Sequence, residues 1–123
     1  MMQEKVGIVR NEKDMQAALE ALGGLRQRAA KVGVAGNREY NPGWHTAIDL
    51  EHLLTCSEAI TRAAIERKES RGGHFREDFD QKKPECATFN ILSRKGPDGR
   101  MQTVRQPIPS MRDDLKQIIE ENK

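Results

Sequence analysis

Residues 67–79 read Arg67-Lys68-Glu69-Ser70-Arg71-Gly72-Gly73-His74-Phe75-Arg76-Glu77-Asp78-Phe79, and we call them the signature segment. The segment is too charged for a core and too regular in residue type for an ordinary solvated linker. If the preceding helix continues to about Arg71, then Arg67 and Arg71 share one face, and Gly72-Gly73 form the C-cap. His74 and Arg76 then leave in an extended segment with their side chains on the same side. Guanidinium groups at a helix end suit carboxylates, phosphates or the carbonyls of a partner.

Two long helices are expected before this segment. Asn11 fits an N-cap, and apolar residues at three-four spacing predict a helix over residues 12–31. Gly23-Gly24 weakens this helix by about 1 kcal/mol per glycine relative to alanine. The glycines could allow a neighbouring helix to approach closely, or they could divide the helix into two pieces; we favour a continuous helix. The second helix is expected to start near Trp44 and run to the signature segment. Its apolar residues spread over more than one face, which predicts a helix covered on two sides and antiparallel to the first.

The remainder of the chain is expected to form an arm. Alternating apolar residues over 87–94 and 101–105, separated by Gly-Pro-Asp-Gly at 96–99, predict a β-hairpin. Ser110 with Asp113 three residues later resembles a capping box, which predicts a short helix over 111–120. We expect a buried stripe on this helix, formed by Leu115, Ile118 and Ile119.

The predicted fold class is mainly α: a long antiparallel helix hairpin, or small helical bundle, with a β-hairpin arm and a short C-terminal helix. The 123 residues form one small domain with a modest core. We divide it into a lead-in (1–10), the helical hairpin ending in the signature segment (11–79), and the arm with the C-terminal helix (80–123).

Composition excludes several classes of protein. With 21 basic and 19 acidic side chains the net charge is only +2, which argues against a dedicated nucleic-acid surface. Residues 1–10 lack the apolar core of a signal peptide, and no stretch approaches the roughly 20 apolar residues of a membrane span. The cysteines, Cys56 and Cys86, suggest neither a disulfide framework nor zinc spacing, so a reducing compartment is the simpler assumption.

No catalytic or metal site is predicted in this chain. His52 and Cys56 are four residues apart on the second helix and His45 is near, but a metal needs further ligands that only His74 and Cys86 could supply. We interpret Cys56 as a small core residue instead. A Cys–His nucleophile pair is not predicted, because nothing in the sequence marks either cysteine as an activated thiol. The glycine-rich fingerprint of a dinucleotide-binding fold is also missing from the sequence.

The order Glu69-Ser70-Arg71-Gly72-x-His74-x-Arg76-x-Asp78 resembles a segment of the succinate dehydrogenase and fumarate reductase flavoprotein family. L-Aspartate oxidases carry a related version. The departure is Asp80, where the family usually has proline. The resemblance covers most of the chain and includes Asn41–His45, Asp49–Leu54, Glu58–Arg62, Pro107–Met111 and Leu115–Ile119.

This resemblance implies a C-terminal helical domain of a larger flavoprotein that oxidises succinate or reduces fumarate with FAD. The domain itself would bind no cofactor and be inactive alone. Implied partners are the FAD-binding and capping domains and an iron–sulfur subunit, without nucleic acid or direct membrane insertion. The implied location is cytoplasmic, peripheral at the inner face of the membrane through partner subunits. The expected docking residues are Arg67, Glu69, Ser70, Arg71, His74, Arg76 and Asp78. Of these, Arg71, His74 and Arg76 are expected to be exposed and mobile in the isolated chain.

Two alternatives remain open at this point. One is the C-terminal domain of an L-aspartate oxidase, although the Pro107–Met111 segment modestly favours the dehydrogenase. The other is a free-standing helical adaptor whose arginines bind an acidic protein or nucleic acid; the near-neutral balance and the 4% aromatic content count against nucleic acid.

Overall fold

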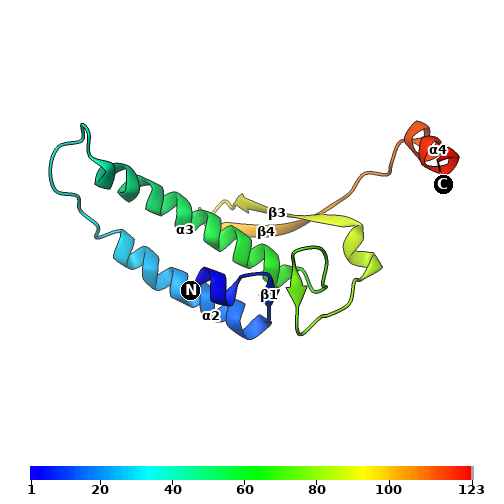
Figure 1. Cartoon of the computed structure of the whole chain (residues 1–123), viewed down its shortest axis with the longest axis horizontal. Helices are drawn as coiled ribbons and strands as arrows, with labels where there is room; N and C mark the ends of the chain where they lie inside the picture. The colour runs from blue at the N-terminus through cyan, green and yellow to red at the C-terminus, as the bar shows by residue number, and fades with distance from the viewer. Residues whose placement is uncertain (123) are drawn as a thin grey trace.

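The computed structural model describes residues 1–122 and is built around two long helices that lie side by side (Figure 1). The elements follow in the order α1 (Met2–Lys5), β1 (Val9–Arg10), α2 (Glu12–Ala29), α3 (Pro42–Glu66), β2 (Phe75–Arg76), the 3-10 helix η1 (Pro84–Ala87), β3 (Phe89–Lys95), β4 (Met101–Pro107) and α4 (Asp113–Glu121). The predicted class, mainly α with a helix hairpin, a β-hairpin and a short C-terminal helix, is confirmed.

Side-chain caps define where the two long helices begin. The Asn11 side chain accepts a hydrogen bond from the Asp14 backbone N–H at 2.8 Å, as an N-cap residue does. Asn41 caps α3 in the same way, with Pro42 in the first turn, where its missing N–H costs nothing. Helix α2 runs through Gly23-Gly24 without a break, as predicted, but no neighbour approaches either glycine closely.

The core is small and lies where α1, α2 and α3 meet. It consists of Val6, Met15, Ala18 and Ala64, with Met2 and Ile65 packed against it. Helix α3 is contacted by α2 and by the β-hairpin, as the prediction of a helix covered on two sides requires, but the cover is incomplete: Leu53 and Ile60 remain 62% and 51% exposed. Cys56 is also exposed rather than a core residue. Part of the apolar surface of α3 is therefore left uncovered by the described residues.

The β-hairpin packs along α3. Strands β3 and β4 are antiparallel with Leu92 opposite Val104, and residues 96–99 make the predicted turn. Gly99 has φ +76°, a conformation that glycine adopts without strain. At the far end of the strands, Arg105 forms an ion pair with Glu66 of α3 at 2.7 Å.

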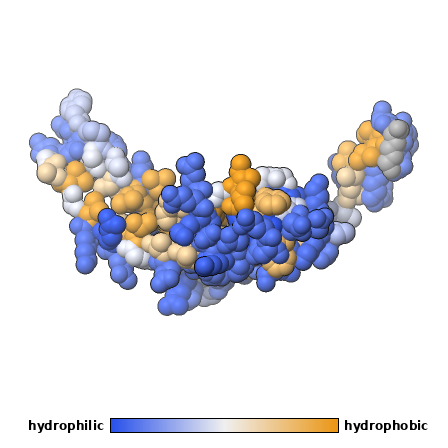
Figure 2. Space-filling view, turned by 60° about the horizontal axis from the view of Figure 1, so that its bottom comes forward, coloured by the Kyte–Doolittle hydropathy of each residue, from blue (hydrophilic) through white to orange (hydrophobic). Residues whose placement is uncertain are grey.

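Helix α4 lies beyond the hairpin, at the end of the molecule, and differs from expectation. Its N-cap is Arg112, with no side-chain capping bond, so the Ser110 capping box does not form. The predicted stripe is not buried: Leu115, Ile118 and Ile119 are 46–54% exposed. Figure 2 shows hydrophobic surface on the lobe that projects from the body at the C-terminal end of the molecule. The sequence pattern identified an apolar face, but nothing within the described residues covers it.

A short parallel pair, β1 with β2, was not anticipated. Val9 lies opposite Phe75 and Arg10 opposite Arg76, which joins the lead-in to the signature segment. Strands of two residues carry no periodic pattern that a sequence could reveal. None of the helices in residues 1–122 has the length and apolar character needed to span a bilayer.

We expect truncation of the core to destabilise the chain strongly. Met15 is fully buried, so Met15→Ala should lower the free energy of unfolding by about 2–5 kcal/mol. Leu53→Ala, at an exposed site of α3, is the matched control and should change it by no more than about 0.5 kcal/mol. Urea denaturation followed by circular dichroism measures both; similar losses in the two variants would contradict this assignment of the core.

Candidate functional site

The signature segment forms a closed loop rather than the end of a helix. Helix α3 stops at Glu66, and Arg67 is extended, with φ −84° and ψ 100°. The prediction that the helix continues to Arg71 with Gly72-Gly73 as its C-cap is therefore wrong. Instead, Arg71 and His74 pair through two backbone hydrogen bonds of 2.8 and 3.1 Å, with Gly72 at φ +58° in the turn between them. The chain thus reverses direction within the segment.

Arg76 lies at the centre of this loop and is fully buried. Its guanidinium donates to the backbone carbonyls of Ala64 and Ile65 at 3.0 and 3.3 Å, which are among the unpaired acceptors at the C-terminus of α3. A cation at this position also complements the helix dipole. Asp78 binds the same guanidinium with two bonds of 2.6 and 2.7 Å, and Glu12 of α2 adds a third of 2.9 Å. Arg76 therefore ends α3 and joins it to α2.

Glu69 is the second buried charge of the loop. Its carboxylate accepts hydrogen bonds from Arg71 at 2.9 and 3.0 Å, from Arg67 at 2.8 Å and from the Lys83 backbone N–H at 2.9 Å. The bonds from Arg71, more than the opposing effect of burial, lower the pKa of Glu69 to about 2. The carboxylate is thus held ionised and fully bonded inside the chain.

Ser70 and Asp78 complete the loop. The Ser70 hydroxyl accepts from the Arg76 backbone N–H at 2.8 Å and donates to the Phe79 carbonyl at 2.9 Å. Asp78 accepts from the backbone N–H of Glu12 at 3.0 Å, at the start of α2. The Arg76 bonds lower the pKa of Asp78 to about 2. Ser70 thus closes the segment on itself, and Asp78 ties the C-terminal part of the segment to α2.

His74 contacts Arg10, a residue that the sequence did not single out. Its Nε2 lies 3.0 Å from the Arg67 carbonyl, so this nitrogen carries the hydrogen, and Nδ1 accepts from the Arg10 guanidinium at 2.6 Å. Burial chiefly lowers the pKa of His74, and the charges of Arg10, Arg76 and Arg67 lower it further. The imidazole is therefore neutral and oriented by two neighbours.

The expectation that Arg71, His74 and Arg76 are exposed holds for Arg71 and is wrong for Arg76, which is buried. Glu69, Ser70 and Arg76 are buried, and Arg67 and His74 are half-buried. Arg71 and Asp78 are exposed. The residues that sequence reasoning missed are Arg10 and Glu12, more than 60 positions away, together with the backbone of Lys83. No local pattern indicates such distant contacts.

A groove runs beside the loop, between α3 and β3, and we call it the docking groove. Its volume is about 540 Å³. Apolar side chains of Ile60, Ala63, Ile91 and Leu92 line it together with Arg10, Arg67 and His74. An apolar groove rimmed by hydrogen-bond donors suits a polypeptide surface better than a small reactive substrate.

Within residues 1–122, no three His, Cys, Asp or Glu side chains are arranged to hold a metal ion. Cys56 is exposed on α3 and Cys86 is buried in η1. No buried side-chain nitrogen or oxygen of the described residues lacks a hydrogen-bond partner. The polar groups of the loop are used to hold the structure together.

This combination of a helix pair, a satisfied polar loop and an uncovered apolar surface is typical of an accessory domain of a larger protein. The family model described as "Fumarate reductase flavoprotein C-term" matches residues 1–117. The chain belongs to this family and is the C-terminal domain of a succinate dehydrogenase or fumarate reductase flavoprotein.

Individual relatives agree with this assignment. The chain is 34% identical over 83 residues to the fumarate reductase flavoprotein subunit of Haemophilus influenzae, covering 67% of this chain and 14% of that protein. It is 33% identical over 82 residues to the succinate dehydrogenase flavoprotein subunit of Coxiella burnetii, covering 66% and 14%. The solved structure of Mycobacterium smegmatis Sdh1 in complex with UQ1 matches 98% of this chain and 21% of its own, with 38% identity and a TM-score of 0.88. The matched region is thus less than a fifth of the length of these two curated relatives.

We expect the Arg76 contacts to dominate the stability of the loop. Arg76→Ala leaves buried carbonyls and Asp78 without their donor and should lower the free energy of unfolding by about 3–5 kcal/mol. Arg76→Lys keeps the charge but loses the paired bonds, so its loss should be smaller. The control is Arg105→Ala, which removes an exposed ion pair worth about 0–1 kcal/mol. Equal losses of unfolding free energy for Arg76→Ala and Arg105→Ala in urea denaturation would contradict the role of Arg76 as a buried, fully bonded charge.

Acid should weaken the loop through Glu69. Folding lowers the pKa of this carboxyl from 4.5 to about 2, so the unfolded chain binds more protons between those values. The stabilisation is complete above about pH 5 and is lost as the pH falls toward 2. NMR titration of the Glu69 side-chain carbon should give a midpoint near 2, whereas a midpoint in the ordinary glutamate range would refute the bonds to Arg71 and Arg67.

Proposed function

We propose that this domain packs against the FAD-binding domain of its flavoprotein through the docking groove and the adjacent β1–β2 pair. The observation that carries the proposal is the uncovered apolar surface at this corner. Ile60 and Leu92 line the groove and are 51% and 40% exposed. Val9 and Phe75, paired across β1 and β2 next to Arg10 and His74, are also exposed. Uncovered apolar side chains in the groove and on the strand pair beside it are typical of an interface.

The signature residues would have two different roles, one inside the loop and one at the interface. Glu69, Ser70 and Arg76 fix the shape of the loop from inside, because their polar atoms are bonded within the chain. Arg71 and His74 are placed to contact the partner. The Arg71 side chain is 40% exposed and bonds only to Glu69 and the Lys83 carbonyl. Docking through Arg67 and Asp78 would be secondary, since their side chains are less exposed than that of Arg71, at 20% and 31%.

The whole flavoprotein would transfer a hydride between succinate and FAD, in either direction. FAD would be held by the domain that precedes this one, and the present chain would supply no catalytic residue. An iron–sulfur subunit and the capping domain are the further partners that family membership supports. The complex would be cytoplasmic and peripheral at the inner face of the membrane. L-Aspartate oxidase has less support, since the two curated relatives are named fumarate reductase and succinate dehydrogenase.

Co-expression with the N-terminal flavin domain of the same flavoprotein tests the docking. The two pieces should co-purify as a yellow complex that oxidises succinate, whereas the present chain alone should be colourless and inactive. Ile60→Glu places a charge in the groove and should weaken binding at least tenfold, about 1.4 kcal/mol. The control is Val32→Glu, which changes an apolar residue 52% exposed, just after α2 and outside the groove.

Two results would contradict the proposal. One is flavin binding or succinate turnover by the present chain alone. The other is equal binding of the Ile60→Glu and Val32→Glu variants to the flavin domain, which would place the interface elsewhere.

A further inference from the structure

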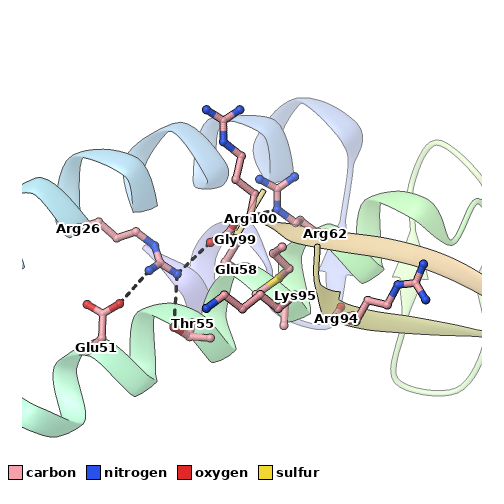
Figure 3. Close-up of a pocket in the computed structure, with 12 residues that line it drawn as sticks. Arg26, Glu51, Thr55, Glu58, Arg62, Arg94, Lys95, Gly99 and Arg100 are labelled. Atoms are coloured by element: carbon pink, nitrogen blue, oxygen red, sulfur yellow. Dashed lines mark hydrogen bonds and ion pairs between the residues drawn. The ribbon is translucent and has the colours of Figure 1, made fainter. Parts of the chain in front are cut away.

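A second and larger cleft lies on the helix pair under the tip of the β-hairpin, and we call it the hairpin cleft (Figure 3). Its volume is about 870 Å³, and α2, α3, β3, β4 and the hairpin turn all contribute to it. It shares no lining residue with the docking groove. Its charged lining residues are Arg26, Glu51, Glu58, Arg62, Arg94, Lys95 and Arg100.

The two acids of the cleft are already neutralised by cations on the helices. Arg26 of α2 reaches across to α3, where it binds Glu51 at 3.0 Å and Glu58 at 2.9 Å. Arg62 binds the other oxygen of Glu58 at 2.7 Å. These bonds hold α2 against α3 and form the floor of the cleft.

The hairpin adds three cations that have no acid of their own. Within residues 1–122, no ion pair joins Arg94, Lys95 or Arg100 to a carboxylate. Figure 3 shows the guanidinium groups of Arg94 and Arg100 pointing away from the cluster around Arg26. With five cations and two acids, the lining carries a charge of +3, although the whole chain carries only +2. The excess positive charge of the domain is therefore concentrated at this cleft.

We propose that the hairpin cleft binds an acidic polypeptide segment of a partner protein, with Arg94, Lys95 and Arg100 contacting its carboxylates. Charge complementarity is the first argument, because guanidinium groups pair with carboxylates through two parallel bonds. The second is the lining itself, in which Thr55, Ala59 and Met101 lie between the charges and suit the mixed surface of a peptide. The third is the absence of any aromatic side chain from this lining, which leaves no stacking platform for nucleic-acid bases.

The test uses a hexaglutamate peptide as probe, with binding to the purified protein measured by fluorescence anisotropy at low salt. The unmodified protein should bind it, and binding should weaken as salt rises, since the contacts are exposed ion pairs. Combined replacement Arg94→Gln, Lys95→Gln and Arg100→Gln should weaken binding at least tenfold. The control replaces three exposed lysines outside the cleft, Lys13→Gln, Lys68→Gln and Lys82→Gln, and changes the net charge by the same amount.

The control variant should retain the affinity of the unmodified protein. An equal loss of affinity in both triple variants would show that binding depends only on net charge, and would overturn the proposal. Failure of the unmodified protein to bind hexaglutamate would also overturn it. Tighter binding of tripolyphosphate or of single-stranded DNA through the same three residues would overturn the choice of an acidic polypeptide. These outcomes are independent of docking at the groove, because none of the substituted residues lines it.

Discussion

The buried guanidinium of Arg76 is the interaction on which the rest of the structure depends. It satisfies carbonyls at the end of α3, pairs with Asp78 of its own loop and reaches Glu12 at the start of α2. Three segments are thus held at one point by a group that has no exposed surface. A buried charge is tolerated only when its bonds are complete, and every buried side-chain donor and acceptor in the described residues has a partner.

This polar centre compensates for a small hydrophobic core. Four buried residues form the main cluster, while many large apolar side chains on α3, the β1–β2 pair and α4 remain exposed. Such an excess of exposed apolar side chains is expected of a chain that packs against another domain through part of its surface. Under the proposed docking, the internal ion pairs would give this corner a fixed shape, and the uncovered side chains beside it would provide the contact. The hairpin cleft, with its excess of cations, adds a separate surface that shares no residue with the docking groove.

The sequence predicted those features that depend on local chemistry. The Asn11 cap, the continuous α2 and the hairpin turn at 96–99 follow from neighbouring residues, and all are present. The internal role of Arg76 could not be predicted, because Glu12 lies 64 positions away and no periodicity connects the two. The contact of Arg10 with His74 could not be predicted for the same reason, since these residues are also 64 positions apart. The stripe on α4 was identified correctly as apolar and wrongly as buried, since an amphipathic pattern does not say what covers it.

The central claim is that Arg76 is enclosed in this chain even without a flavin domain. Hydrogen exchange of the arginine Nε–H groups, followed by NMR in the isolated chain, tests it most directly. The Nε–H of Arg76 donates to Asp78 at 2.6 Å in a buried side chain, so its exchange should be slower by orders of magnitude than that of the exposed Arg94. Equally fast exchange at both positions would show that the guanidinium of Arg76 is open to solvent, and would contradict its role as the buried centre of the domain.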